Sequence, residues 1–320
     1  MTLAEHPVEP LSPDESRRRC LAIRDELIRA GLVRIAAPEQ ESDSTSPIAR
    51  FRISPVPFRI PASDLAFFQH LGQDLLAFYR ALNRLYQESV KGIQPGWVSA
   101  YLDQGKPESL IAYSRMNRFR TLIPAVIRPD VIPTADGMVI TELDSVPGGI
   151  GLTACLSRAY DQHTGQDGPA VRDSLIAGRD ALLRAHQGDH TGCAAIVVSE
   201  EAKEYRPEMD WMAQRLREIG LETYCVEPRA VQFTEEELFL HTPEGRRPIG
   251  VIYRFYELFD LKNIPKAELI MYAAKKETVA VTPPYKPALE EKLAFALFHH
   301  PELAPFWEQA LSRDTLASLN

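Results

Sequence analysis

The chain has few cysteines and no pattern that would pair them. Its 320 residues include four, and no two of them form a C-x-x-C motif. Cys225 lies in an apolar strand pattern and Cys155 in a helical one, whereas Cys20 and Cys193 stand far from both. Buried free thiols are therefore expected, rather than a disulfide framework or a zinc site.

Long apolar runs are also missing. No run approaches the roughly 20 residues that a helix needs to span a bilayer. The N-terminal segment has early acidic residues and no apolar core of the signal-peptide type. The formal net charge is −8, and no dense stripe of Lys and Arg offsets it, which argues against general nucleic-acid affinity. The sequence predicts a cytoplasmic protein that binds neither membranes nor nucleic acid.

Several familiar catalytic signatures are absent. The chain contains no G-x-S-x-G, H-E-x-x-H, Walker A or G-x-G-x-x-G motif. Serine hydrolases, zinc proteases, P-loop NTPases and dinucleotide oxidoreductases use these motifs, so all four classes lack support. The length suffices for one large core or for two lobes.

The most informative segment is residues 128–151, RPDVIPTADGMVITELDSVPGGIG. Arg128 and Asp130 are two residues apart, as are Glu142 and Asp144. Residues two apart on a β-strand share one face. Gly137, after Ala-Asp, marks a turn because glycine readily takes a positive φ. The segment therefore predicts a β-hairpin with charged side chains on both strands.

Two registers of this hairpin are open. A three-residue loop of residues 135–137 pairs Thr134 with Met138 and carries Asp130 to a position opposite Glu142. A two-residue Asp136-Gly137 turn instead sends the two acidic pairs to opposite faces. Both faces carry apolar residues, so the pattern alone does not decide between the registers.

The three-residue loop also places Arg128 opposite Asp144. Three carboxylates and one guanidinium then share a face. Directly opposed like charges destabilise a sheet by roughly 0.2–1 kcal/mol. Asp130 opposite Glu142 therefore favours a cation between them. The alternative is a surface hairpin with an Arg128–Asp144 ion pair and two solvated acids.

A glycine-rich loop follows the hairpin and leads into a helical pattern. Backbone N–H groups at a helix start, together with the positive end of its dipole, suit a phosphate. The predicted phosphate-binding residues are Ser145, Gly148, Gly149 and Gly151. Oxygen ligands without Cys or His suit Mg²⁺ or Mn²⁺ bound together with substrate phosphates.

These residues carry a family resemblance. The succession of R-x-D, a DG turn, E-x-[ND]-S and a P-x-G loop resembles the metal-binding hairpin of the circularly permuted ATP-grasp ligases, the glutathionylspermidine-synthase-like group. The resemblance extends from about Pro57 to Trp307. Supporting segments are Ile252–Phe255, Glu291–Leu293 and His300–Leu303.

The resemblance implies roles for the hairpin residues. Asp130, Glu142 and Asp144 would hold Mg²⁺ ions that bridge the phosphates of ATP, and Arg128 would neutralise the transferred phosphoryl group. Asp144 stands where the family usually has asparagine, so the number of bound ions stays open. The implied activity is an ATP-dependent carboxylate–amine ligase that acts through an acyl phosphate on small-molecule substrates. A homo-oligomer is compatible with this interpretation.

A second hypothesis comes from the end of the chain. In the permuted family, a β-rich part that grips the adenine follows the region matched here. The sequence stops at Leu319-Asn320, so a fragment of a longer ligase and a natural short form are both expected alternatives. The alternative function is a non-catalytic metal- or phosphate-binding protein, or an inactive ligase relative, completed by a partner.

The pattern of elements predicts a mixed α/β fold in two lobes. Residues 1–190 would form N-terminal helices and an ATP-grasp-like metal-binding lobe with the antiparallel hairpin. Residues 191–320 would form a smaller βαβ lobe, like the domain that precedes ATP-grasp folds, with C-terminal helices. Strand, helix and strand over residues 194–226 predict parallel pairing.

Three basic residues are weaker candidates. Arg254 ends an apolar strand, where it could bind a substrate carboxylate; pairing with Glu257 or Asp260 is equally open. Lys292 is a substrate-binding candidate through the family resemblance. Lys286 is expected to be exposed rather than to bind a phosphate.

Overall fold

The computed structural model describes residues 11–33, 52–58, 60–135, 137–164, 174–185 and 192–320. It divides into two compact units. The small unit comprises Met1–Arg59 and Gly149–Ile176, and the large unit comprises Ile60–Gly148 and Ala177–Asn320. These units differ from the expected lobes of residues 1–190 and 191–320, and that functional division stays a prediction.

The small unit pairs α1 (Pro13–Arg29) with α5 (Ile150–Thr164). Ser12 caps α1, because its hydroxyl accepts a hydrogen bond from the backbone N–H of Glu15 at 3.2 Å. Such a cap satisfies one of the free donors at a helix start. The local pattern therefore fixes where this helix begins.

A long helix, α2 (Ala62–Val90), organises one core of the large unit. Its stripe of Leu75, Tyr79, Leu82 and Tyr86 is buried, as the helical spacing predicts. Within the described ranges, no helix combines the length and apolarity needed to cross a bilayer. The other helices of this unit are α3 (Gly96–Asp103), α4 (Glu108–Ser114), most of α6 (Ser174–Ala185), α7 (Arg206–Glu218), α8 (Ala267–Lys275), α9 (Ala294–Phe298), α10 (Ala304–Ala310) and α11 (Arg313–Leu319).

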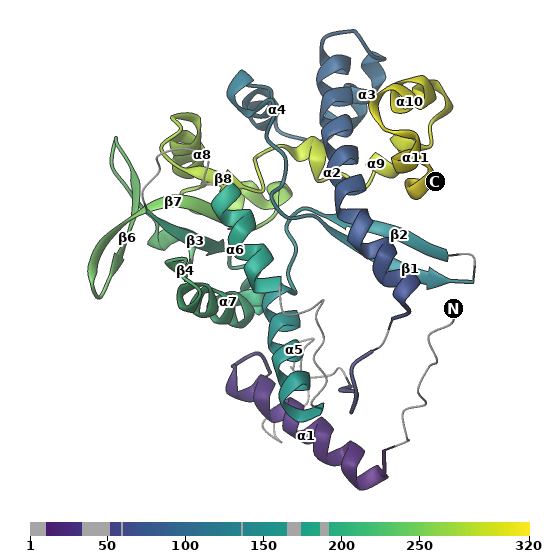
Figure 1. Cartoon of the computed structure of the whole chain (residues 1–320). Helices are drawn as coiled ribbons and strands as arrows, with labels where there is room; N and C mark the ends of the chain where they lie inside the picture. Colours follow the sequence, from purple (N-terminus) through teal and green to yellow (C-terminus); the bar gives the residue numbers. More distant parts are fainter. Residues whose placement is uncertain (1–10, 34–51, 59, 136, 165–173, 186–191) are drawn as a thin grey trace. The chain divides into compact units, whose positions relative to one another are not determined.

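A six-stranded mixed sheet forms the second core of the large unit (Figure 1). Its order is β4-β3-β7-β6-β5, and β8 also pairs with β7. Every residue of β3 is buried, which agrees with its unbroken apolar sequence. The strands are β3 (Cys193–Val198), β4 (Thr223–Val226), β5 (Gln232–Phe233), β6 (Leu238–Thr242), β7 (Gly245–Phe255) and β8 (Ala280–Thr282).

The predicted strand–helix–strand unit is confirmed. β3 and β4 run parallel, with Ala194 opposite Thr223, and α7 between them in sequence packs on both strands. The buried side of α7 carries Met209, Met212 and Leu216. Together with the antiparallel hairpin described below, this confirms the mixed α/β class.

Candidate functional site

The charged hairpin consists of β1 (Arg128–Thr134) and β2 (Gly137–Asp144), which pair antiparallel. Thr134 faces Gly137, so two residues connect the strands. The prediction that Thr134 faces Met138 is wrong, and so is a turn at Asp136-Gly137. Gly137 has a φ of +129°, a conformation that L side chains rarely adopt, so it closes the turn.

A β-bulge then restores the predicted charged register. Val131 faces Ile140, whereas its neighbour Asp130 faces Glu142. Thr141 is therefore the extra residue on β2, and its hydroxyl donates to the Asp130 carbonyl at 3.2 Å. A bulge bends its strand and can re-aim side chains. The pairing of Asp130 with Glu142 is confirmed, although its predicted cause was wrong.

Arg128 is the centre of the charged face. It pairs with Asp144 across the hairpin, as predicted, with 3.1 Å between Nη2 and Oδ2. Its Nε lies 3.2 Å from Asp130 Oδ1, and its Nη1 donates to the Gly148 carbonyl at 3.2 Å. One guanidinium therefore neutralises two carboxylates and ties Gly148, at the start of the glycine-rich loop, to the hairpin.

Lys292 supplies a second cation from a distant part of the chain. Its Nζ lies 2.9 Å from Glu142 Oε1, and this hydrogen bond raises the pKa of Lys292. The Lys292 side chain is 72% exposed, so it can leave the carboxylate without unpacking the core. The fold thus brings Lys292 next to a predicted metal ligand, although no local sequence pattern connects Lys292 with the hairpin.

The carboxylates do not form a preformed metal cage. In the part of the chain that the structure describes, no three His, Cys, Asp or Glu side chains are grouped closely enough to hold an ion. Asp144 Oδ1 accepts from the Val146 N–H at 2.8 Å, while Arg128 and Lys292 engage other oxygens. Binding an ion would require these oxygens to turn from the two cations toward it.

Ser145 faces the core. Its side chain is buried, with Oγ 3.3 Å from the Tyr79 hydroxyl, and it donates to the Leu289 carbonyl at 3.2 Å. These bonds anchor the segment that follows the hairpin. The backbone rather than the hydroxyl of Ser145 is therefore the group available to a phosphate.

Gly148 needs to be glycine for steric reasons. A Cβ there would lie 2.6 Å from Cε1 of Tyr205 and 3.6 Å from Cζ of Phe255. Gly149 and Gly151 belong to the small unit. Gly149 has a φ of +93°, and its carbonyl accepts from Thr153 N at 2.9 Å. The loop thus has two separate local reasons for glycine, and its phosphate role stays a prediction.

Arg254 makes an ion pair with an unforeseen partner. Its side chain is fully buried, and Nη2 contacts Glu290 rather than Glu257 or Asp260. The Nε group donates to the Pro283 carbonyl at 3.1 Å. Since the guanidinium is buried and its donors are engaged, the geometry favours the ion-pair interpretation over contact with a substrate carboxylate.

Burial raises the pKa of Glu290 to about 7, and the charge of Arg254 opposes this rise. A carboxyl whose pKa is raised on folding contributes stability that is present below its unfolded pKa and is lost as the pH rises through its folded pKa. Glu290 therefore lowers the free energy of unfolding as the pH rises from about 4.5 toward about 7.

We expect Glu290→Gln to reduce this pH dependence. The neutral amide does not titrate. Between pH 5 and pH 8, the free energy of unfolding of the variant should therefore fall less than that of the wild type, and the difference should reach up to about 3 kcal/mol. Denaturant unfolding at both pH values measures this difference. Glu235→Gln, a substitution of an exposed glutamate, is the matched control. Identical pH slopes for Glu290→Gln and the wild type would refute the assignment.

Lys286 is buried, so the prediction that it is exposed is wrong. The side chain is buried, and its Nζ donates to Asn83 Oδ1 and to the carbonyls of Phe119, Arg120 and Leu122. Burial lowers the pKa of Lys286 to about 8. This lysine ties α2 to the segment before the hairpin, a role that the sequence pattern did not indicate.

Comparison with known proteins supports the fold. No protein-family model and no curated protein matches the chain. Among solved structures, a glutathione synthetase-like effector from Globodera pallida, in its apo form, is similar, with a TM-score of 0.61 at 14% sequence identity. The match covers 97% of this chain and 71% of that one. The chain therefore shares the mixed α/β fold of that effector, as the predicted fold class requires.

Proposed function

We propose that this protein is an ATP-dependent carboxylate–amine ligase of the ATP-grasp type, in the circularly permuted, glutathionylspermidine-synthase-like arrangement. One observation carries the proposal. On a glutathione synthetase-like fold, the hairpin gathers Arg128 and three carboxylates, in the register that the motif predicts. Fold alone does not define an activity, whereas these side chains provide specific chemistry.

The donor set suits Mg²⁺ or Mn²⁺. Asp130, Glu142 and Asp144 offer only oxygen, which hard divalent cations prefer. In this structure Arg128 and Lys292 neutralise these carboxylates. Because the Lys292 side chain is exposed, it can move away and leave the Glu142 carboxylate free to bind an ion. When bound, the ion would offset charge on the phosphates of ATP.

The chain's own groups define what the site can do chemically. A substrate carboxylate oxygen would attack the γ-phosphorus of ATP, and ADP would leave as the acyl phosphate forms. The guanidinium of Arg128 would stabilise the charge on the moving phosphoryl group. An amine nitrogen would then attack the acyl carbon, inorganic phosphate would leave, and the amine would lose a proton.

Trapping of the acyl phosphate tests this function. The protein would be incubated with MgATP, hydroxylamine and a panel of amino acids and peptides as carboxylate donors. We expect a hydroxamate to form together with ADP, one for one. Glu142→Ala should lower the rate at least about 100-fold, since it removes a predicted ligand of a metal ion whose charge stabilisation is worth several kcal/mol. Glu235→Ala, an exposed site on another segment, should keep the wild-type rate.

The same experiment separates the two hypotheses for this chain. MgATP binding that depends on Glu142, without hydroxamate from any donor, would contradict the ligase and favour the non-catalytic metal- and phosphate-binding protein. Hydroxamate formation that survives Glu142→Ala unchanged would contradict the assignment of the hairpin as the reaction site.

A further inference from the structure

A second site is suggested by a cavity in the large unit. The cavity has a volume of about 780 Å³ and lies among α2, the segment 118–127, the end of α6, α8 and β8. Pockets for small molecules typically measure about 300–1,000 Å³. None of the hairpin residues with predicted metal or phosphate roles lines it. Its chemistry can therefore be considered separately from the proposed ligase site.

Positive charge dominates the cavity lining. Arg80, Arg118 and Arg184 line it, against a single carboxylate, Glu277, so the lining carries a net charge of +2. The whole chain has a formal net charge of −8. The cavity thus has the opposite sign to the protein, and an anion entering it would be attracted rather than repelled.

Two of these arginines have no counter-ion in the described ranges. Arg118 Nη1 lies 4.0 Å from Glu277 Oε1, whereas neither Arg80 nor Arg184 forms an ion pair with a described carboxylate. Arg184 lies in the last turn of α6, where a cation commonly bonds the free helix carbonyls. Among the described residues, no such bond from Arg184 is found.

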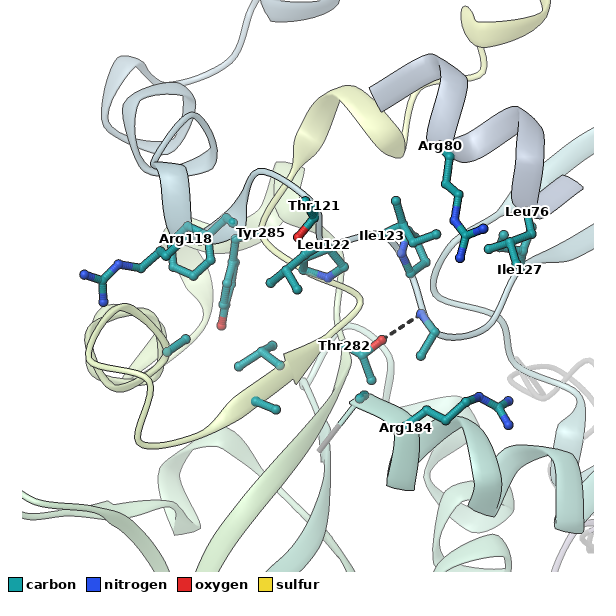
Figure 2. Close-up of a pocket in the computed structure, with 18 of the residues that line it drawn as sticks. Leu76, Arg80, Arg118, Thr121, Leu122, Ile123, Ile127, Arg184, Thr282 and Tyr285 are labelled. Carbon is teal, nitrogen blue, oxygen red and sulfur yellow. Dashed lines mark hydrogen bonds between the residues drawn. The ribbon is translucent and has the colours of Figure 1, made fainter. Parts of the chain in front are cut away.

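The arrangement of these side chains suits a two-part ligand. In Figure 2, Arg80 and Arg184 lie toward the end of the cavity near Ile127, and Arg118 lies at the other end. Between them, Leu122 and Ile123 contribute to an apolar wall.

The wall is held in place by a tertiary hydrogen bond. The Ala125 N–H donates to the buried Thr282 hydroxyl at 3.0 Å (Figure 2). This bond joins the segment before the hairpin to β8. The apolar surface is therefore preformed, whereas the two arginines are exposed and can adjust to a ligand.

We propose that this cavity binds a small amphipathic anion. Its phosphate or carboxylate group would contact Arg80 and Arg184, and its apolar body would lie against Ile123 and Ile127. Guanidinium groups suit this ligand because they bind phosphate and carboxylate through paired hydrogen bonds.

Calorimetric titration with three probes tests the proposal on the full chain. Phenyl phosphate carries both parts of the ligand, inorganic phosphate carries only the anion, and phenol carries only the ring. We expect phenyl phosphate to bind most tightly. Arg80→Gln and Arg184→Gln should each weaken that binding about tenfold or more, since each removes a charged hydrogen-bond donor. Arg229→Gln, an exposed arginine outside the cavity, should have no effect.

The outcomes distinguish this site from the hairpin. Glu142→Ala and Arg128→Gln should leave phenyl phosphate binding unchanged, whatever they do to MgATP. Wild-type affinity in both Arg80→Gln and Arg184→Gln would overturn the proposal. Absence of phenyl phosphate binding to the wild type at millimolar concentration would overturn it as well. Circular dichroism of the variants confirms that each exposed substitution leaves the fold intact.

Discussion

Replacing Arg128 by glutamine is expected to slow hydroxamate formation by about 10³-fold, in line with the effect of arginines that stabilise phosphoryl transfer. The guanidinium lies on the charged face of the hairpin, where it already bridges Asp130, Asp144 and the Gly148 carbonyl. Glutamine keeps a hydrogen-bond donor but lacks the charge. The rate of hydroxamate formation under saturating MgATP measures the loss.

MgATP affinity should respond differently from the rate. Because Arg128 competes with a metal ion for Asp130 and Asp144, its removal frees both carboxylates. We expect the dissociation constant of MgATP to change less than tenfold. Arg229→Gln is the matched control, since it removes an exposed arginine that lines no proposed site. A rate within tenfold of the wild type would show that Arg128 does not act on the transferred group.

Replacing Arg254 by methionine is expected to lower the free energy of unfolding by about 3–5 kcal/mol, because removal of one partner leaves the other charge buried and uncompensated. Arg254 is fully buried, and Glu290 is its counter-ion. The carbonyls of Pro283 and Tyr256 would also lose a donor. Denaturant unfolding at pH 8 measures the effect.

A second pH value and a double variant test the same prediction for Arg254→Met. The loss should be smaller at pH 5, where Glu290 can take up a proton and become neutral. The double variant Arg254→Met with Glu290→Leu should recover much of the stability, since an apolar pair of similar volume often replaces a buried ion pair without loss. A cost below about 1 kcal/mol for the single variant at pH 8 would show that the pair does not stabilise the fold.

The hairpin shows which structural features the local sequence can predict. The two-residue periodicity of its acids and the glycine at the turn predicted an antiparallel pair with charges on one face. The structure confirms the pairing of Asp130 with Glu142. It reaches that register by a shorter turn and a bulge at Thr141. Both strand faces carry apolar residues, so periodicity could not reveal an inserted residue that changes which side chains face the core.

Long-range partners explain what the sequence analysis missed. The Lys286 ammonium meets Asn83 and carbonyls of residues 119–122, more than 160 positions away. Glu290 reaches Arg254 across 36 positions. Helix and strand periodicity concerns neighbours a few residues apart, so it carries no information on such contacts. In contrast, the strand–helix–strand unit that begins with β3 depends on local residues and was predicted.

The central claim is that the hairpin carboxylates hold a divalent ion together with nucleotide phosphates. Relaxation of water protons by Mn²⁺ with ATP measures this directly, because a manganese–nucleotide complex that binds to the protein tumbles more slowly and relaxes water faster. The account predicts a strong enhancement with the wild type and with Glu235→Ala, competition by Mg²⁺, and little enhancement with Glu142→Ala. Equal enhancement by Glu142→Ala and the wild type, or none by the wild type, would contradict it.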